Sequence, residues 1–357
     1  MSLTTTYLGL TLNSPLVASA SPIAGKLANL RRLEDAGAAA IVLPSLFQEQ
    51  IEAEEGARQG QVDAYSDSSP EAQSYFPAEA KGPYGIGPEH YLDLIRRGSE
   101  AVSIPIIASL NGSTRAGWVE YARAIDQAGA AAIELNLYHV PTDLEESGRA
   151  VEDRYLDIVA AICSDVALPV SVKLTPFLSS IGHFATQLTE CGAAGLVLFN
   201  RTLQPDIDLV HLRLIDSLDL SDASELRLPL LWTALLAGRT KASLALSTGV
   251  SSSGDVVKGL LAGADVVMTT SALLRHDVGY LAKLTDGLRN WMDAREIGSV
   301  DKMRGLLSWQ RSKDRSVYTR ANYLRILERY AAEAMPRFEP VSKRAGIATQ
   351  ALEELPS

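Results

Sequence analysis

At four places in the chain a glycine between small residues separates a helical pattern from a short apolar run. Glycine ends a helix in the left-handed conformation without steric cost, and a short apolar run is typical of a strand buried on both faces. The pattern therefore predicts units of a helix followed by a parallel strand, with polar residues where the strands finish. The four runs are Ala39–Leu43, Ala132–Asn136, Gly195–Asn200 and Asp265–Thr269.

Four further runs of the same kind lie between these, which gives eight predicted strands. They are Leu16–Ser19, Pro105–Leu110, Pro169–Leu174 and Ser243–Gly249. The intervening segments carry apolar residues at helical spacing. The clearest are Gly117–Gln127, Val151–Cys163, Ile181–Thr189 and Asp255–Leu261. Eight alternating units predict an α/β protein with a closed (β/α)8 TIM barrel. A doubly wound open sheet is the alternative, but it usually has a glycine fingerprint after the first strand, where this chain has Ala18–Pro22.

Two connections are longer than a minimal barrel needs. Leu46–Glu89 follows the second strand, and a segment from Leu203 to about Leu230 follows the sixth. Connections of this length inside a compact domain are usually functional, and both emerge on the side where barrels build active sites. The barrel is predicted to span residues 1–310, followed by a helical tail, 311–357, with a polar end. We expect the tail to pack on the barrel or to contact another subunit, as in a homodimer.

Composition narrows the class of partner. The chain is 46% hydrophobic and 21% charged with a net charge of −10, and no basic cluster interrupts that balance. Nucleic acid and anionic membranes are therefore not expected partners. The sequence has no signal-peptide pattern and no apolar stretch that approaches a membrane span, so we expect a cytoplasmic protein.

Cysteine and histidine usage predicts no metal site. Cys163 and Cys191 fall on predicted helices and are too few for an iron–sulfur site or a disulfide framework, so we expect buried structural thiols. Four histidines are scattered without metal-ligand spacing and are interpreted as surface or packing residues. They are His90, His183, His211 and His276.

Strands seven and eight end in small and hydroxyl residues, Thr248–Val250 and Thr270–Ser271, just before predicted helices near Gly254 and Leu273. Backbone N–H groups at such ends form the usual phosphate site of a TIM barrel, which predicts a phosphorylated ligand. Gly249–Gly254 superficially matches a Walker loop. Asp255 and the residue after it stand where that motif needs Lys and Ser or Thr, so nucleoside triphosphate binding is rejected.

Lys173 is the most informative single residue because it lies inside an otherwise apolar strand. A lysine there is desolvated at a cost unless an anion receives it. Three interpretations remain open: an ion-paired lysine at the barrel mouth, a Schiff-base lysine, or a cation that stabilises charge on a cofactor. Asn136 and Asn200 end the two neighbouring strands, so their amides could form a planar hydrogen-bonding floor for a flat heterocycle.

Several motifs together resemble the dihydroorotate dehydrogenases, the FMN-containing TIM barrels of pyrimidine biosynthesis. The resemblance covers about residues 4 to 310, and its motifs are Tyr7–Leu10 with Asn13–Pro15, Glu134–Leu137, Val172–Pro176 and the ends of strands seven and eight. It implies contacts with the isoalloxazine ring of FMN from Ala18, Ser19, Ser45, Asn136 and Lys173. It further implies that the backbone at Gly249, Val250, Thr270 and Ser271 holds the phosphate. Asn136 and Asn200 match asparagines that the family uses on its pyrimidine substrate.

The chain departs from the family pattern mainly on the substrate side. The family reads Asn-x-Ser-Cys-Pro-Asn after strand four, or has serine as its base, whereas this chain has His139 at the base position. The family's Asn-Ser after strand six is Asn200-Arg201, and its Thr-Lys-Ser after strand two is Leu43–Ser45. The resemblance therefore implies a divergent member of the family, for which we expect dihydroorotate to be a poor substrate or none.

The function expected from the sequence is an FMN-dependent oxidoreductase that acts on a CH–CH group of a small planar anion, dihydroorotate or a related acid. His139 is the predicted base because imidazole titrates near neutrality, although Tyr138 is equally close in sequence. Arg201 is the predicted partner of a substrate carboxylate. Two alternatives remain. One is a flavin-free lyase or aldolase that uses Lys173 on a phosphorylated substrate, and the other is a catalytically degenerate barrel that serves as an interaction subunit.

Overall fold

The computed structural model describes residues 1–48, 88–111, 115–201, 205–215 and 219–334. The chain divides into two compact units, Met1–Arg311 and Ser312–Ser357, and the first contains every barrel strand. None of the helices in these described ranges is long and apolar enough to cross a lipid bilayer.

Eight parallel strands close into a barrel, which confirms the predicted fold. Around the barrel the order is β3, β4, β5, β6, β7, β8, β11 and β12, and β12 pairs again with β3. Their bounds are β3 Leu16–Ala18, β4 Ala40–Phe47, β5 Ile106–Asn111, β6 Ala132–Asn136, β7 Val170–Leu174, β8 Gly195–Leu198, β11 Ser243–Leu246 and β12 Val266–Thr269.

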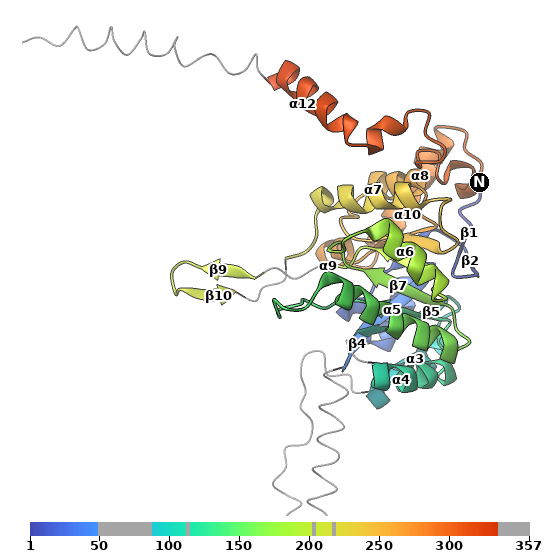
Figure 1. Ribbon diagram of the computed structural model, residues 1–357. Coiled ribbons are helices and arrows are strands. Elements are labelled where there is room, and N and C mark those ends of the chain that lie inside the picture. The colour runs from blue at the N-terminus through green and yellow to red at the C-terminus, as the bar shows by residue number, and fades with distance from the viewer. Residues whose placement is uncertain (49–87, 112–114, 202–204, 216–218, 335–357) are drawn as a thin grey trace, which may run out of the picture. The chain divides into compact units, whose positions relative to one another are not determined.

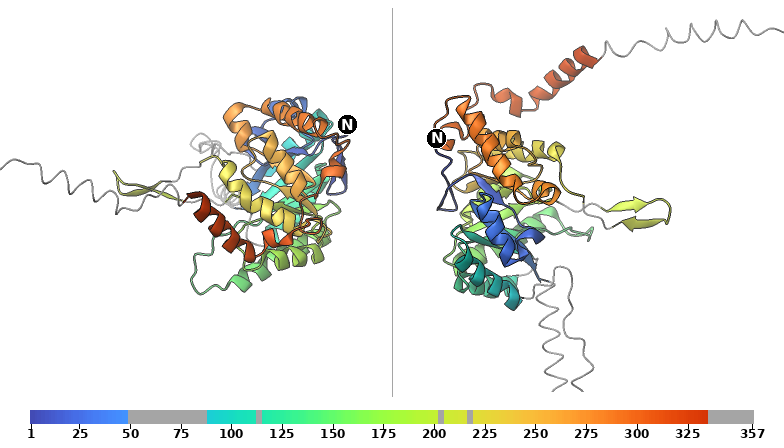
Figure 2. Two further views of the ribbon diagram at one scale, coloured as in Figure 1. Left: turned by 90° about the horizontal axis from the view of Figure 1, so that it is seen from above. Right: turned by 180° about the vertical axis from the view of Figure 1, so that it is seen from behind.

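Helices follow the strands and cover the outside of the barrel, as the three views in Figures 1 and 2 show. The four helices with the clearest sequence pattern are all present, each extended by one to three residues at one or both ends. The bounds are α1 Leu27–Asp35, α3 Pro88–Ala101, α4 Arg115–Gln127, α5 Gly148–Asp165, α6 Ile181–Glu190, α7 Arg227–Leu236, α8 Ser253–Ala262, α9 Ser271–His276, α10 Tyr280–Asp293 and α11 Val300–Met303, with a 3-10 turn η1 at Pro22–Gly25.

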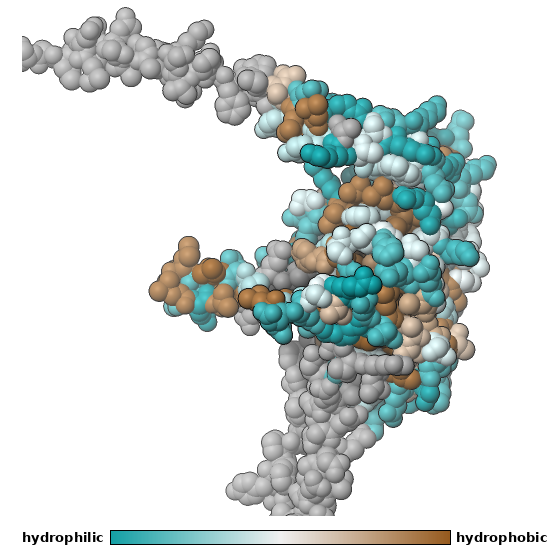
Figure 3. All heavy atoms as spheres, viewed as in Figure 1, coloured by the Kyte–Doolittle hydropathy of each residue, from teal (hydrophilic) through white to brown (hydrophobic). Residues whose placement is uncertain are grey.

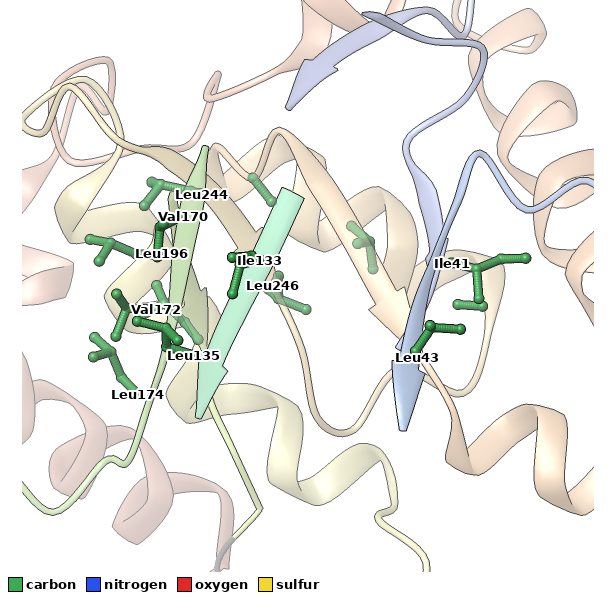
Figure 4. Close-up of a cluster of buried hydrophobic side chains, with 14 of the residues drawn as sticks. Ile41, Leu43, Ile133, Leu135, Val170, Val172, Leu174, Leu196, Leu244 and Leu246 are labelled. Atoms are coloured by element: carbon green, nitrogen blue, oxygen red, sulfur yellow. The ribbon is translucent and has the colours of Figure 1, made fainter. Parts of the chain in front are cut away.

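Side chains alternate along each strand between the barrel interior and the helical layer. The outward set, which includes Ile133, Leu135 and Val172, packs with the helices in one large core (Figure 4). The inward set, which includes Ile107 and Val197, forms a second and smaller buried cluster. The continuous apolar runs in the sequence reflect this burial on both faces.

A short N-terminal hairpin closes the amino end of the barrel. It pairs β1, Thr5–Tyr7, with β2, Leu10–Leu12. The two loop residues, Leu8 and Gly9, have φ values of 54° and 78°, as a tight hairpin turn requires. Tyr7 and Leu8 are buried in the inner cluster, and the Leu8 N–H donates to Ser243 Oγ of β11 at 3.1 Å.

The two long connections differ in part from the prediction. β4 continues to Phe47 and α3 already begins at Pro88, while residues 49–87 lie outside the described ranges. After the sixth barrel strand the chain forms a hairpin of β9, Asp206–Asp208, and β10, Arg213–Ile215, and then a 3-10 turn, η3, Ala223–Leu226. The hairpin exposes apolar side chains, which appear brown in Figure 3. They are Ile207, Leu209, Val210, Leu212 and Leu214.

The second unit begins with a 3-10 turn, η4, Arg315–Tyr318, and continues in α12, Ala321–Ala334. This helix lies within the tail, 311–357, for which the sequence predicted helical structure. Within the unit, Arg325 Nη1 lies 3.5 Å from Asp314 Oδ2.

The two thiols, which were expected to be buried structural groups, are half-buried. Cys163 lies on α5, while Cys191 is the residue that caps the carboxyl end of α6. Burial raises the pKa of Cys163 to about 11. A thiol with so high a pKa is poorly reactive, which agrees with a structural role.

The contact between the hairpin and the barrel predicts a stability effect at Gly195. A Cβ at this position would clash with Leu8 Cδ2 and lie 3.3 Å from Ser171 Cβ. We expect Gly195→Ala to lower the free energy of unfolding by roughly 1–3 kcal/mol, because overpacking strains a close-packed interior. Chemical denaturation measures this change.

Gly148→Ala is the matched control, since a Cβ there meets nothing within 4 Å. A Leu8→Ala, Gly195→Ala double variant should lose less stability than the two single losses combined. Equal stabilities of wild type and Gly195→Ala would show that the hairpin does not fill the barrel end tightly.

Candidate active site

A cavity of about 240 Å³ opens at the carboxyl ends of the barrel strands. This is the end at which TIM-barrel enzymes place their chemistry. Its walls come from the ends of β3, β7, β8, β11 and β12 and from the segment after the β9–β10 hairpin. The side chains include Ser19, Lys173, Asn200, Arg201, Asp219, Ser221, Ser247, Thr248, Met268, Thr269, Thr270 and Ser271.

Next to this cavity, three polar side chains form a closed network inside the barrel mouth. Asn136 Nδ2 donates to Ser45 Oγ and to Ser109 Oγ, both at 2.8 Å, and the two hydroxyls lie 2.9 Å apart. The other amide atom, Asn136 Oδ1, is buried and has no hydrogen-bond partner among the described residues. An unsatisfied buried acceptor costs about 1–3 kcal/mol, so this oxygen is suited to a ligand N–H group.

Lys173 reaches into the barrel from β7, directly beside Asn136 in the strand register, and is 7% exposed. Its Nζ atom lies 3.3 Å from Glu134 Oε1 and 3.4 Å from Ser19 Oγ. Both distances are long for a charge-assisted hydrogen bond. The ammonium group is therefore an ion-paired cation that retains donor capacity towards the barrel mouth.

Glu134 was not singled out from the sequence, although it is fully buried and is the ion-pair partner of Lys173. It stands two residues before Asn136 on β6, so both side chains face the interior. A charged residue inside an apolar strand was the signal that could have identified it. The same argument had identified Lys173.

The ends of β11 and β12 are fixed by hydroxyl contacts and by backbone conformation. Thr248 and Gly249 have φ values of 76° and 77°, and a Cβ on Gly249 would lie 2.9 Å from Asp222 O. Thr269 Oγ1 donates to Val250 O, and Thr270 Oγ1 donates to Ser19 O. These contacts hold the backbone of β11, β12 and β3 together at the cavity wall.

Part of the long connection after the sixth strand, which the sequence predicted to be functional, borders these ends, and its contacts through Ser221 and Arg275 were not predicted. Ser221 donates through its N–H to Ser271 Oγ at 3.1 Å, and the Gly249 N–H makes a 3.4 Å contact with Ser221 Oγ. Arg275 donates to the carbonyls of Leu220 and Ser221, both at 2.7 Å. Since this segment lies far from the strand ends in sequence, no local pattern could connect them.

The amino end of α8 already holds an internal anion. Asp255 accepts hydrogen bonds from the N–H groups of Ser251 and Ser252 and from Lys258 Nζ. Burial acts to raise the pKa of Asp255, but the hydrogen bonds from Lys258 and Ser252 outweigh it, so the pKa is lowered. The N–H groups of Ser251 and Ser252, at the amino end of α8, are therefore already bonded to a carboxylate of the chain itself. The other expected helix, α9, begins at Ser271, two residues earlier than predicted.

The predicted substrate residues at the end of β8 line the same cavity as Lys173. Asn200 Oδ1 accepts from the Arg201 N–H at 3.0 Å. Arg201 Nε lies 3.0 Å from Glu225 Oε2 of η3. The guanidinium group thus already has one carboxylate partner.

His139 lines a different cavity, of about 290 Å³, between the loops that follow β6 and β7. Its Nε2 atom lies 3.5 Å from Glu146 Oε2, and Glu146 also pairs with Arg154. Burial, followed by the charge of Arg154, lowers the pKa of His139. The histidine is therefore largely neutral at physiological pH, as a general base needs to be.

The structure brings some of the predicted residues together and separates others. Ser19, Lys173, Asn200, Arg201 and the β11 and β12 ends share one cavity, and Asn136 with Ser45 lies beside it. Ala18 belongs to the outer core, so only its backbone faces the mouth. His139 shares no wall with that cavity, and its role stays a prediction.

Comparisons with known proteins support the same family as the motifs. A family model described as dihydroorotate dehydrogenase matches residues 82–292. The catalytic subunit of dihydroorotate dehydrogenase B (NAD(+)) from Halalkalibacterium halodurans is 30% identical over 224 residues, 59% of this chain and 70% of that protein. The same subunit from Thermoplasma volcanium is 26% identical over 309 residues, 85% of this chain and 98% of that protein.

A further relative from Aeropyrum pernix, provisionally named dihydroorotate dehydrogenase A (fumarate), is 29% identical over 214 residues, 58% of this chain and 68% of that protein. The family match covers more than half of the chain, and it spans most of the barrel strands and the lysine on β7. The chain therefore belongs to the dihydroorotate dehydrogenase family.

Proposed function

We propose that the protein is an FMN-dependent oxidoreductase that oxidises a small planar anion at the carboxyl end of its barrel. The observation that carries this proposal is the buried Lys173 ammonium beside the unsatisfied Asn136 Oδ1 at the barrel mouth. A cation and an orphaned acceptor on adjacent strands match the polar edge of an isoalloxazine ring, which offers both carbonyl oxygens and an N–H group.

The residues around this pair fit a flavin ring. Ser19 and Ser45 contribute hydroxyl groups within the same polar cluster, and the Ala18 backbone lies at the end of the adjoining strand. Their side chains are small, so a flat ring can approach the strand ends closely. This fit supports FMN as the cofactor.

In this proposal, backbone N–H groups at the ends of β11 and β12 donate hydrogen bonds to the FMN phosphate. Gly249 has no side chain to block an approach, and among the residues that the structure describes its N–H makes only the long contact with Ser221. Val250, Thr270 and Ser271 line the same cavity wall and add backbone N–H groups. Backbone donors at these strand ends are the usual phosphate ligands of a TIM barrel.

When bound, FMN would supply a two-electron acceptor for a hydride. The residues of the chain then have separate tasks. Lys173 stabilises the negative charge that develops at the mouth, and Asn136, Asn200 and Arg201 orient a planar carboxylate substrate through amide and guanidinium donors. His139 is the proposed base. It follows Asn136 by three residues, so their Cα atoms are at most about 11 Å apart.

The proposed substrate class is dihydroorotate or a related acid. The relatives described above are named dihydroorotate dehydrogenases. In this chain Arg201 and His139 stand at two of the substrate positions of the family, so the preferred acid is proposed to differ from dihydroorotate. A planar carboxylate remains the class that the donors of Asn200 and Arg201 favour.

The ion pair of Lys173 argues against the lyase alternative. A Schiff-base lysine attacks as the neutral amine, whereas Lys173 faces the Glu134 carboxylate as a cation. A degenerate barrel is distinguished by experiment, because its bound FMN would not be reduced by any small donor.

The first test of the function is the colour of the protein. We expect it to purify yellow, with one non-covalent FMN per chain, because the proposal assigns both ring contacts and phosphate donors to residues at the barrel mouth. Reverse-phase chromatography of the released chromophore identifies and counts the cofactor. A colourless protein that takes up no FMN on reconstitution would rule out the proposal and favour the lyase.

The second test concerns the base. The pKa of His139 is lowered, so the neutral imidazole persists to more acidic pH than in a free histidine. The rate of flavin reduction should be level near neutrality and fall only as the pH drops through that lowered pKa. His139→Asn should remove this acid-side decrease in rate (the acid limb of the pH profile) and slow flavin reduction by roughly 10²–10⁴-fold.

Stopped-flow reduction across a pH series measures this profile. His183→Asn, a change at an exposed position on α6, is the control and should keep the acid limb. If His139→Asn retains both the rate and the limb, the base is another group.

The third test is anaerobic mixing with dihydroorotate. We expect slow or no bleaching of the flavin, because His139 and Arg201 replace the residues with which the family handles this substrate. Fast and stoichiometric bleaching would show that the family's own activity persists in this chain despite both departures.

A further inference from the structure

Glu134 is a buried ionisable group to which the proposed reaction gives no task. It is 0% exposed, and it faces the barrel interior between β5 and β7. One of its oxygens lies 3.3 Å from Lys173 Nζ, and the other, Oε2, has no hydrogen-bond partner among the described residues. A carboxylate held in this way is costly to bury.

The surroundings of Glu134 do not explain that cost. Its partners in the strand register are Ser109 and Ser171, but their hydroxyls are hydrogen-bonded to Asn136, Ser45 and the Ile133 carbonyl. The deeper interior is filled by apolar side chains such as Ile107 and Val197. Tyr7 lies close enough for the negative charge of Glu134 to contribute to its raised pKa, of which burial is the larger cause. Apolar residues of similar volume usually stabilise an interior as well as a buried ion pair does. Packing alone therefore gives no reason for a glutamate here.

We propose that Glu134 is a positioning residue that holds the Lys173 ammonium at the barrel mouth and sets how much positive charge reaches the flavin. This inference rests on the proposed function. The carboxylate lies next to the ammonium, below it in the barrel, so the two charges partly cancel at the cofactor. The lysine alone would favour the reduced flavin strongly, and the pair favours it moderately.

The charges predict opposite effects from the two partners. Glu134→Gln keeps the shape and a hydrogen-bond acceptor for Lys173 but removes the negative charge. In this variant the ratio of the affinities for reduced and oxidised FMN should rise at least about tenfold above the wild-type ratio. This change corresponds to an increase of about 30 mV in the two-electron reduction potential of the bound flavin. Lys173→Met should shift the potential downward by at least as much.

Tyr7→Phe is the matched control for this measurement. It removes a hydroxyl from the same buried region without changing any charge. Its potential should equal that of the wild type. The potentials are measured by equilibration with reference dyes during slow reduction, so no substrate is needed.

A second measurement uses the apoprotein and is independent of flavin. Removing one member of a buried ion pair leaves the other charge uncompensated, and this is strongly destabilising. The Lys173→Met, Glu134→Gln double variant should therefore unfold at a higher temperature than Lys173→Met alone, by roughly 5 °C. Such non-additivity is the signature of a direct interaction.

The outcomes separate this proposal from the proposed function. Additive losses in the apoprotein would overturn it, because the two side chains would then not act as a pair. A Glu134→Gln potential that is unchanged or lower would overturn it as well, and Glu134 would be a structural residue only. If the apoprotein shows non-additive stability losses but neither the wild type nor any variant binds FMN, the ion pair exists and the proposed function is wrong. The role of Glu134 in setting the charge at the flavin is then wrong as well.

Discussion

The closed interior of the barrel is the constraint on which the site depends. Each strand turns alternate side chains inward, and these must fill a narrow space from the N-terminal hairpin to the mouth. At the lower end the chain uses apolar residues, such as Leu8 and Val197. Because of the same alternation, Glu134, Asn136 and Lys173 must share the interior, and paired strands set them side by side. The ion pair and the polar mouth are therefore consequences of strand register.

A polar interior has to satisfy its own hydrogen bonds, and this chain does so only in part. The network of Ser45, Ser109 and Asn136 consumes both donors of the amide: one bond reaches Ser109 on the neighbouring strand β5, and the other reaches Ser45 on β4, one strand further. Asn136 Oδ1 and Glu134 Oε2 remain without partners among the described residues. Unsatisfied buried atoms in natural proteins gather where a ligand or a charge effect compensates for them. Both of these lie at or just below the mouth. Deeper in the interior, the Tyr7 hydroxyl is likewise without a partner among the described residues.

The strands and helices could be predicted because burial on both faces leaves continuous apolar runs and because glycine marks each helix end. The same pattern identified Lys173, because a charged residue is unusual among apolar neighbours in a strand. Glu134 was not identified in this way, since it was interpreted only as part of a strand motif. Ser221 and Arg275 could not be predicted, since their contacts depend on how a distant segment returns to the mouth. Nor could the sequence reveal that Asp255 occupies the first turn of α8, because a capping carboxylate and an open phosphate site begin with similar residues.

The two residues that depart most from the family pattern share a physical feature. His139 faces Glu146, and Arg201 faces Glu225. In each case a carboxylate from an adjoining loop or turn meets the side chain that is assigned to substrate. An anionic substrate must therefore share the Arg201 guanidinium with Glu225 or displace it, and the planar fork has enough N–H groups to serve two carboxylates. In the proposed function, substrate specificity would therefore depend on the loop after β8 at the Lys173 cavity and on the loop after β6 at the separate cavity that His139 lines. The proposed flavin contacts would depend on the barrel strands, and because strand register fixes these strands, the loops can differ without disturbing the charged pair below.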